Sequence, residues 1–355
     1  ACGGTGGHLF PGIAVGEALR ARGHEVMLLI SEKKVDSEAS AKYTHLHFKT
    51  VPAVAKPPTL SPRMLPFLWK LWGSIGQCKA IIREFQADAV LGMGGFTSLP
   101  PVAAGHKLGL KTFIHDSNAR PGRANVMTSR FCTRVFLGLD AAKKFFPNRE
   151  TVTTGTPVRP EITHLPSRED AAARFGLDPA RPTIVVTGGS QGARRLNELS
   201  AQAASSLPPE TQVLHIAGPT DYEEVRDVYA KHPTLPQHVA AFCHRMDLAY
   251  RVADLAIARS GASSMAELAY FGVPSILVPY PFAAEDHQTR NAEIFDAAGA
   301  AKLLTEKEIN ADILADTVRS LMLDPQKSAA MKKAAIKMAI RDSAEKIANL
   351  MMKQA

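Results

Sequence analysis

The sequence predicts an α/β protein made of two doubly wound domains. Short apolar segments typical of buried strands alternate with helical segments along all 355 residues, and such alternation indicates parallel sheets. The series occurs twice, on either side of a proline-containing stretch at residues 156–166, where we place the domain boundary. The length also fits two domains of about 150 residues each.

In the first half, the pattern predicts one helix after a cluster of glycines, and three strands. The helix covers residues 12–22, and the strands cover residues 25–30, 87–91 and 111–114. A glycine cluster such as Gly3–Gly7 normally follows a buried strand. We therefore expect a strand on its N-terminal side that this sequence does not include.

The second half repeats this plan and ends in a long helix. We expect strands over residues 183–187, 213–217, 255–258 and 275–278, because each is short and apolar, as buried parallel strands are. Apolar residues recur at helical spacing over residues 334–352, at Ile336, Ile340, Ile347 and Leu350, which predicts a single terminal helix. This helix either caps the second domain or crosses back to the first.

The composition excludes several classes of protein. Hydrophobic residues make up 45% of the chain and charged residues 21%, as in a soluble globular protein rather than a disordered one. No uninterrupted apolar run approaches the ~18 residues of a membrane span, and no signal peptide opens the sequence. The four cysteines form no C-x-x-C pair, so we expect a reducing cytoplasm, without disulfides or a cysteine zinc site.

The net charge of +8 is unevenly distributed along the chain. Residues 1–160 carry a net charge of +11, and residues 161–355 carry −3. We therefore expect the first domain, and not the second, to meet an anionic surface or ligand.

Four glycine-containing turns are candidate ligand loops, at residues 3–8, 92–95, 188–192 and 260–264. In open α/β sheets ligands bind beyond the carboxyl ends of the strands, and a helix that follows such a turn offers N–H groups to a phosphate. A single turn can equally serve tight packing, but turns in both halves favour a nucleotide-diphosphate site in a cleft between the domains. The motifs G-x-G-x-x-G and G-x-x-x-x-G-K-[ST] are absent, which disfavours a dinucleotide site and P-loop ATP hydrolysis.

Several polar residues stand at or near these turns. His8 acts either as a general base or as a structural histidine. Glu267, in the second turn of a helix that begins near Ser260, either holds ribose hydroxyls or stabilises the helix dipole. Asn118 follows the strand that ends at residue 114, within either a ligand loop or a turn network. Arg159 either binds phosphate oxygens or is a solvated linker residue.

The sequence predicts no metal site. It contains no Asp-x-Asp motif, which would be the usual Mg²⁺ clamp of many sugar-nucleotide enzymes. Glu285, Asp286 and His287 are consecutive and cannot converge on one ion without further partners.

The segment 64–72 contains both tryptophans and is flanked by the basic residues Arg63, Lys70, Lys79 and Arg83. Apolar and aromatic side chains rimmed by cations suit a bilayer interface. The alternative is a buried helix with a charged rim. Composition alone favours the buried helix slightly, and the positive charge of the first half favours the membrane.

Together these segments resemble the MurG family of bacterial N-acetylglucosaminyltransferases. The resemblance covers nearly the whole chain and rests on GGTGGHLFP at 3–11, GMGGFTSLP at 92–100, HDSNARPGRAN at 115–125, TGTPVR at 154–159, TGGSQGARRLN at 187–197 and SGASSMAELAYFGVPSILVPYPFAAEDHQTRNA at 260–292. It implies the glycosyltransferase B fold, in which two Rossmann-like domains face each other across a cleft. It also implies inverting transfer of GlcNAc from UDP-GlcNAc to the C4 hydroxyl of MurNAc in undecaprenyl-pyrophosphoryl-MurNAc-pentapeptide (lipid I), which gives lipid II.

The resemblance also implies roles for individual residues. His8 matches the histidine discussed as the base for the acceptor hydroxyl. The diphosphate contacts would fall on Ser190 and the helix start at Ala262, Ser263, Ser264, Met265, Ala266 and Glu267, with Glu267 on the ribose. GlcNAc hydroxyls would meet His287 and Gln288, and uracil would meet the backbone of Cys243. Thr5, Gly6, Gly7, Asn118 and Arg159 would complete the donor and diphosphate contacts.

The chain departs from the family pattern at three of these places. HDSN stands at 115–118 where HEQN is usual, His287 stands where a second glutamine often lies, and Cys243 replaces a branched aliphatic residue. Asn118 is retained, so the first departure bears on acceptor contacts near Asp116, and the third bears on uracil packing.

The implied organisation assigns the acceptor and the membrane to residues 1–158, with the helix at 336–355 packing back on them, and UDP-GlcNAc to residues 159–335. The implied partners are UDP-GlcNAc, lipid I and an anionic membrane surface, with room for other cell-wall synthesis proteins but not for nucleic acid, and no cofactor is implied. The protein would be peripheral, at the cytoplasmic face of the bacterial inner membrane.

Other functions stay open on the sequence alone. They are a different glycolipid-forming transferase, a UDP-GlcNAc 2-epimerase of the same fold, and a non-catalytic membrane scaffold. The missing G-x-G-x-x-G disfavours an NAD-type dehydrogenase.

Overall fold

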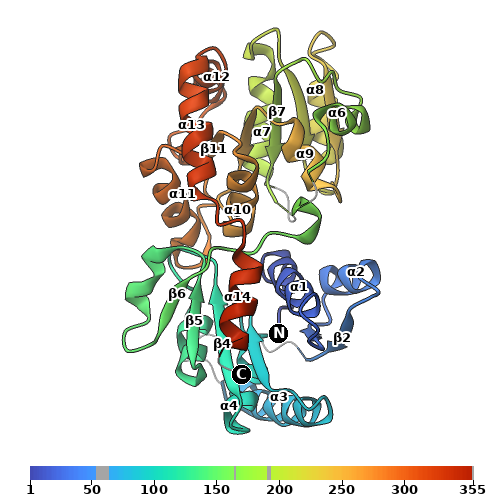
Figure 1. The fold of residues 1–355 in the computed structure, drawn as a ribbon. Helices are drawn as coiled ribbons and strands as arrows, with labels where there is room; N and C mark the ends of the chain where they lie inside the picture. Colours follow the sequence, from blue (N-terminus) through green and yellow to red (C-terminus); the bar gives the residue numbers. More distant parts are fainter. Residues whose placement is uncertain (53–63, 164, 190–192, 354–355) are drawn as a thin grey trace. The chain divides into compact units, whose positions relative to one another are not determined.

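The computed structural model describes residues 1–52, 64–163, 165–189 and 193–353 and divides the chain into two compact units (Figure 1). Unit 1 comprises Ala1–Pro160 together with Arg341–Ala355, and unit 2 comprises Glu161–Ile340. Both units are α/β, and every strand pairing in them is parallel. The predicted fold class is therefore confirmed.

The described residues of unit 1 form two parallel sheets. Its elements are α1 (Gly6–Arg20), β1 (Met27–Ile30), α2 (Lys34–Lys42), β2 (His47–Thr50), α3 (Met64–Glu84), β3 (Ala89–Gly92), α4 (Leu99–Lys107), β4 (Lys111–Asp116), α5 (Arg123–Thr128), β5 (Arg134–Leu137), β6 (Thr151–Thr153) and α14 (Ser343–Met352). β1 pairs with β2, and β3, β4, β5 and β6 form the second sheet in that order. α14 packs on α1, although the two helices lie at opposite ends of the chain (Figure 1).

Unit 2 is built on one sheet with the strand order β12-β11-β10-β7-β8-β9. Its elements are α6 (Arg168–Phe175), β7 (Thr183–Thr187), α7 (Arg194–Gln202), β8 (Gln212–Ile216), α8 (Tyr222–Tyr229), β9 (Gln237–Ala240), α9 (Met246–Val252), β10 (Leu255–Ala258), α10 (Ala262–Phe271), β11 (Ser275–Leu277), α11 (His287–Ala297), β12 (Ala301–Leu303), α12 (Ala311–Met322) and α13 (Pro325–Met338). The chain adds strands to one side of β7 and then to the other, so the order reverses between β7 and β10. This reversal is the topological switch point of the sheet.

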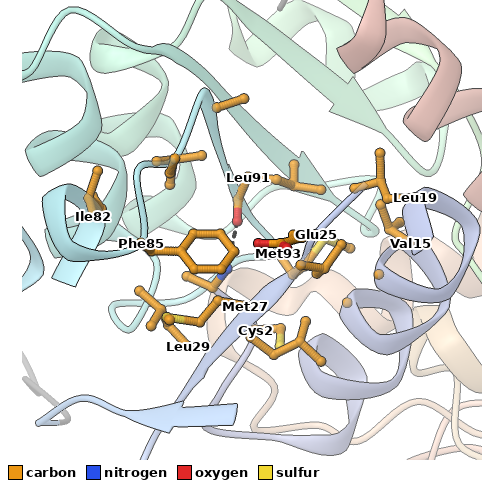
Figure 2. Close-up of a pocket in the computed structure, with 18 of the residues that line it drawn as sticks. Cys2, Val15, Leu19, Glu25, Met27, Leu29, Ile82, Phe85, Leu91 and Met93 are labelled. Atoms are coloured by element: carbon orange, nitrogen blue, oxygen red, sulfur yellow. Dashed lines mark hydrogen bonds between the residues drawn. The ribbon is translucent and has the colours of Figure 1, made fainter. Parts of the chain in front are cut away.

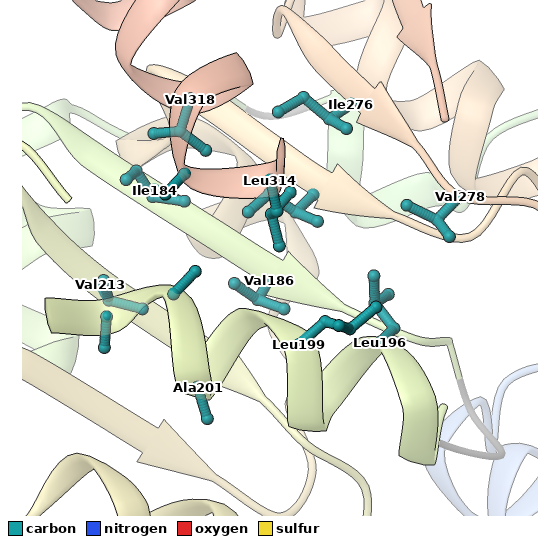
Figure 3. Packing of buried hydrophobic residues seen from close by; sticks show 14 of the residues in the cluster. Ile184, Val186, Leu196, Leu199, Ala201, Val213, Ile276, Val278, Leu314 and Val318 are labelled. Carbon is teal, nitrogen blue, oxygen red and sulfur yellow. The ribbon is translucent and has the colours of Figure 1, made fainter. Parts of the chain in front are cut away.

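The core of unit 2 explains why its strands were recognisable from sequence. The side chains of β7 at Ile184 and Val186 pack with Leu196 of α7 and Leu314 of α12 (Figure 3). All five residues of β7 are buried, and a strand buried in this way reads as a continuous apolar run rather than an alternating one. The predicted strands at 183–187 and 255–258 accordingly coincide with β7 and β10.

The helix expected at residues 12–22 begins earlier, at Gly6. The carbonyl of Thr5 accepts the N–H groups of His8 and Leu9, at 3.1 Å and 3.0 Å, so the last part of the glycine cluster already forms the first helical turn. Pro11 lies within this helix. A sequence pattern that treats glycine and proline as helix breakers misses this start.

The single helix expected over residues 334–352 is wrong: the structure has two helices, separated at Ala339–Asp342. α13 buries Met331 and Ala335 and packs on α10 in unit 2. α14 buries Ile347, Ala348 and Met351 in unit 1. The buried residues of the two helices thus belong to different units, whereas Ile336 of the predicted pattern is exposed. The backbone leaves the helical region at Ala339, where ψ is 125°.

The apolar side chains near the start of α3 are exposed, so the alternative of a buried helix with a charged rim does not describe this segment, and contact with a membrane stays a prediction. Trp69 is 85% exposed, Leu65 74% and Trp72 66%. The opposite side of the helix is buried through Phe67, Cys78 and other residues. Within the described part of the chain, no helix is long and apolar enough to cross a membrane.

Candidate active site

In unit 1, the glycine loop at residues 3–8 is held from two sides. Asp36 of α2 is fully buried, and its Oδ2 accepts the N–H groups of Gly4 and Ser31, both at 2.8 Å. Thr97 Oγ1 donates to the carbonyl of Gly3 at 2.7 Å. A Cβ at Gly3 would lie 2.3 Å from the backbone nitrogen of Ser31, so this position requires glycine. The loop is therefore fixed where it enters α1.

His8, in the first turn of α1, lies against the glycine turn that follows β3. A Cβ on Gly94 would lie 2.7 Å from Cε1 and 2.8 Å from Nδ1 of the His8 ring, and Gly94 has a φ of +117°. Glycine is needed there for both its conformation and its size. The turn thus provides a flat backbone surface against which the imidazole packs.

Asn125 of α5 ties this turn to the loop at residues 116–125. Its Oδ1 accepts the N–H of Gly95 at 3.0 Å, and its Nδ2 donates to Asp116 Oδ2 at 2.6 Å. The side chain of Asn125 is 4% exposed. Because a buried polar group that loses its partner is costly, Asn125 couples the positions of the two loops.

Asp116 organises its own loop. It is 1% exposed, and it accepts the N–H of Asn118 at 2.9 Å and that of Gly122 at 3.2 Å. Burial raises the pKa of Asp116, while hydrogen bonds from Asn118, Asn125 and Gly122 act in the opposite direction. The carboxylate at the position where the family usually has glutamate therefore holds the loop that presents Asn118.

Two further polar residues of unit 1 are His115 and Arg159. His115 is fully buried, its Nε2 donates to the carbonyl of Gly155 at 2.9 Å, and burial lowers the pKa of this histidine to about 4. Its ring is therefore neutral at physiological pH. The guanidinium of Arg159 lies over the ring of Phe10, 4.6 Å from its centroid, in a cation–π contact.

In unit 2, the candidate ligand loops leave the sheet at the switch point. Thr187 at the end of β7 pairs with Ala258 at the end of β10, so the loops after these strands start side by side. Gly188 and Gly189 begin one of them, and Ser260 and Gly261 lead the other into α10. The first turn of a helix leaves N–H groups without helical partners, and its dipole favours anions. The loops after β7 and β10, together with the first turn of α10, therefore suit a diphosphate.

The start of α10 combines accessible and buried residues. Ala262, Ser263, Ser264 and Ala266 are half-buried, whereas Met265 and Glu267 are 1% and 3% exposed. The small half-buried residues leave the first turn approachable.

Gln288 of α11 connects three segments around this helix start. Its Oε1 accepts the N–H of Tyr280 at 2.9 Å, and its carbonyl accepts the Oγ hydrogen of Ser260 at 2.8 Å. Asn291, fully buried one turn later, donates from Nδ2 to the Ser260 carbonyl at 3.1 Å. The amide nitrogen of Gln288 carries two further N–H donors, which fits a sugar-hydroxyl contact.

The segment before α11 has an uncommon backbone. Glu285 and Asp286 have φ angles of +56° and +55°, a region that non-glycine residues rarely adopt and that often marks functional loops. His287 follows as the first residue of α11, and its Nδ1 bonds to the carbonyl of Ala284 at 2.7 Å. This turn fixes the direction in which His287 and Gln288 leave the loop.

Arg259 supports the same region from the interior. It is 7% exposed, donates from Nη1 to the carbonyls of Val278 and Pro279, both at 3.1 Å, and forms an ion pair with Glu306. Its guanidinium lies 5.5 Å from the centroid of the Tyr280 ring.

The remaining expected site residues are placed as follows. Thr5 is the exposed N-cap of α1, and Gly6 and Gly7 form its first turn. Cys243 is a half-buried cysteine between β9 and α9. Ser190 lies outside the described residues. Across the described residues, no group of three or more His, Cys, Asp or Glu side chains is arranged to hold a metal ion.

Sequence reasoning missed Asn125 and Arg259. Asn125 lies 30 residues from its partner Gly95, and Arg259 lies 47 residues from Glu306. Their position in the sequence was the available signal, because Asn125 and Arg259 each stand at the border between a ligand loop and an apolar strand or helix. Such a signal predicts burial but not the partner.

Comparison with known proteins identifies both units. Residues 1–137 match the glycosyltransferase family 28 N-terminal domain, and residues 183–347 match the glycosyltransferase family 28 C-terminal domain. A UDP-N-acetylglucosamine–N-acetylmuramyl-(pentapeptide) pyrophosphoryl-undecaprenol N-acetylglucosamine transferase of Geobacter metallireducens is 36% identical, over 99% of this chain and 96% of its own length. The transferase of the same name from Trichormus variabilis is 38% identical, over 99% and 95%.

Solved structures agree with this assignment. The crystal structure of Acinetobacter baumannii MurG has a TM-score of 0.79 at 28% identity and covers 99% of this chain and 98% of that one. A UDP-N-acetylglucosamine 2-epimerase from Listeria monocytogenes has a TM-score of 0.70 at 14% identity, over 97% and 94%, and this likeness extends to the fold alone. The chain belongs to the MurG family of N-acetylglucosamine transferases, glycosyltransferases with the glycosyltransferase B fold.

Proposed function

We propose that the protein transfers GlcNAc from UDP-GlcNAc to the C4 hydroxyl of MurNAc in lipid I, forming lipid II for peptidoglycan synthesis. The observation that carries the proposal is the 36% identity over 99% of the chain to a transferase named for these substrates. Unit 2 binds UDP-GlcNAc, and unit 1 binds the acceptor.

The reaction is one in-line displacement at the anomeric carbon. The donor is α-linked and the product β-linked, so a single step with inversion suffices. In this step the acceptor C4 oxygen forms the new bond, its proton passes to His8, and the bond to the UDP oxygen breaks. The packing of His8 against Gly94 supports this role because a fixed ring can be aimed at the acceptor oxygen.

The negative charge that develops on UDP needs stabilisation. We assign it to the N-terminus of α10 and to Arg159, which together require no metal ion. Ser190 and Ala262–Glu267 hold the diphosphate and ribose, and His287 and Gln288 hold the GlcNAc hydroxyls. The Tyr280 and Ser260 bonds of Gln288 support its assignment, because they fix its amide beside the helix start.

The exposed residues of α3 attach the enzyme to an anionic membrane, at the cytoplasmic face of the inner membrane. Trp69 and Trp72 are exposed on this helix, and Lys107 lies 4.5 Å from the centroid of the Trp72 ring. Lys70 and Arg83 are also exposed on α3. Aromatic side chains among cations suit the headgroup region, where each basic residue adds about 1 kcal/mol.

A transfer assay tests the proposal. Purified protein is incubated with radiolabelled UDP-GlcNAc and a soluble lipid I analogue, with and without EDTA. We expect label in the lipid product when the analogue is present, unchanged by EDTA. Conversion of the UDP-sugar without acceptor would instead indicate an epimerase, and tight UDP binding without any turnover would disprove the catalytic function.

The role of His8 has its own test. We expect His8→Ala to lower turnover by ~10²-fold or more with little change in UDP-GlcNAc affinity. His232→Ala, after α8, is the matched control and should leave turnover unchanged. Near-normal turnover of His8→Ala would remove His8 from the role of base.

A further inference from the structure

The interiors of the two units differ in their polar content. Unit 1 contains a cavity of about 140 Å³ whose lining is mainly apolar, for example Val15, Leu29 and Phe85 (Figure 2), and such a lining gives a ligand few groups that fix its orientation. In unit 2, a series of buried polar side chains connects α8, β8 and α7. This series ends at the edge of the sheet where the candidate UDP loops begin.

Each hydrogen bond in this series has a defined direction. His215 of β8 is fully buried, and burial lowers its pKa to about 3, so its ring is neutral and has one donor and one acceptor nitrogen. The amide oxygen of Asn197 in α7 lies 3.1 Å from His215 Nε2, so this nitrogen is the donor. Nδ1 is then the acceptor, and Tyr229 of α8 donates its hydroxyl hydrogen to it at 3.1 Å.

Asn197 uses its other hydrogen-bonding groups on the loop that follows β8. Its Nδ2 donates one hydrogen to the carbonyl of Ala217 at 2.7 Å and the other to Asp221 Oδ2 at 2.8 Å. The side chain is buried, and its oxygen and both its N–H groups are engaged. Rotation of the amide would leave several buried groups without partners, which is costly. The side chain of Asn197 therefore has one favoured orientation.

The carboxylate of Asp221 is used for this link and not for capping α8. Asp221 is the residue before α8, where an aspartate usually accepts an N–H of the first helical turn. In this helix, all of which is described, the side chain of Asp221 makes no capping bond. Its carboxylate accepts from Asn197 instead. Both ends of the loop 217–221 are therefore attached to the first residues of α7.

The loop 217–221 leaves the sheet beside the loops assigned to UDP. Thr187, the last residue of β7, pairs with Ile216 of β8 on one side and with Ala258 of β10 on the other. The segments that follow these three strands therefore start next to one another at the carboxyl edge of the sheet, where ligands of doubly wound sheets bind. Asn197 joins two of these segments, because α7 follows β7 and the loop 217–221 follows β8.

We propose that Asn197 and His215 are positioning residues for UDP, which hold the loop 217–221 beside the start of α7 so that the backbone of this loop borders the nucleotide. This inference rests on the proposed binding of UDP-GlcNAc by unit 2. Both side chains are buried, so they act through the loop and not by contact with the nucleotide. A loop that is already held in its binding conformation loses less conformational freedom when the ligand binds, and this raises affinity.

Calorimetry with UDP and the full chain tests the proposal. We expect Asn197→Ala to raise the Kd for UDP about 10-fold, because the loop loses both of its attachments. Gln212→Ala is the matched control. Gln212 also lies on β8 and, like Asn197, is 1% exposed, and it donates to the carbonyls of Asp178 and Arg181, but at the opposite end of the strand. This control should lower stability and leave the Kd for UDP unchanged.

Further variants separate positioning from general stability. Asp221→Ala removes one attachment near the surface, with less effect on folding, and should raise the Kd for UDP about 3-fold. His215→Gln can still donate to Asn197 and should retain the affinity, whereas His215→Phe fills similar space without a donor and should weaken binding about 10-fold. In transfer assays of Asn197→Ala, KM for UDP-GlcNAc should rise while kcat at saturating donor stays within about 2-fold.

The outcomes distinguish this inference from the function on which it rests. An unchanged Kd for UDP in Asn197→Ala and Asp221→Ala would overturn the inference. Equal weakening by Gln212→Ala, or by His215→Gln and His215→Phe, would overturn it as well, since the effect would then follow stability alone. Absence of UDP binding by the unaltered chain would contradict the proposed function itself.

Discussion

The buried imidazole of His115 makes the stability of unit 1 depend on pH. Its pKa is lowered to about 4 by burial, with a smaller contribution from the nearby His8. In the unfolded chain a histidine titrates near 6.5. Between these values the unfolded state binds more protons than the folded state, so stability is retained above about pH 6.5 and decreases as the pH falls towards 4.

The magnitude follows from these two pKa values. From about pH 7.5 to about pH 5, the linkage relation gives a loss of about 2 kcal/mol in the free energy of unfolding from His115 alone. The substitution His115→Gln removes the titration, and its amide can still donate to the Gly155 carbonyl. We therefore expect the variant to lose about 2 kcal/mol less than the parent over this pH range.

The assay is urea unfolding with pulse proteolysis at both pH values, in which peptides from unit 1 are quantified by mass spectrometry. Peptides from unit 2 report separately on the other buried histidine, His215, whose pKa burial lowers to about 3. The His115→Gln variant should change the pH dependence of unit 1 peptides and leave that of unit 2 peptides alone. Equal pH dependence of unit 1 in parent and variant would refute the reasoning.

Three other predictions concern the site and the membrane surface. Gly94→Ala should lower kcat by about 10²-fold, because it would displace the imidazole of His8, which we propose as the base, and even a small displacement of a base is costly; normal kcat would show that the turn does not position the ring. Asn125→Asp places a second carboxylate beside Asp116, so the free energy of unfolding should fall by about 3 kcal/mol near neutral pH. This loss should become smaller at acidic pH, because the two carboxylates then share a proton. A loss that does not depend on pH would contradict this. Trp69→Ser should weaken binding to phosphatidylglycerol vesicles by about 10-fold, measured by sedimentation. Phe282→Ser, at a similarly exposed position in unit 2, should not weaken it. Equal effects of the two substitutions would argue against α3 as the membrane-contacting helix.

The parts of the fold that the sequence predicts well are those decided locally. A buried parallel strand needs only a short run of apolar, β-branched residues, and β7 and β10 were found with their observed bounds. The glycine turns were also found, because their residue type is required by the backbone itself, as at Gly94 with its φ of +117°.

Features decided by distant contacts could not be predicted in this way. The helical spacing from Ile336 to Ile347 runs unbroken in sequence, but it is divided between two helices, and only Ile347 of these two residues is buried. The exposure of Trp69 depends on which side of α3 meets the core, and composition alone cannot tell this. The role of Asn125 in joining two loops was not predicted, because its hydrogen-bond partners, Gly95 and Asp116, lie in other segments of the chain. The candidate site was thus located by its glycines, whereas its supporting hydrogen bonds required the structure.

The position of α14 has a consequence for the order in which the protein is made. Ile347 and Met351 of this helix cover Phe113 and Phe136, whose rings stack at 5.5 Å. Unit 2 is contiguous in sequence, Glu161–Ile340, whereas unit 1 requires the last segment of the chain. During synthesis, unit 2 can therefore finish folding before α14, which packs on the stacked rings of unit 1, has been synthesised. A ribosome that stops before Ser343 would release a chain with an exposed apolar surface, a substrate for chaperones and proteases.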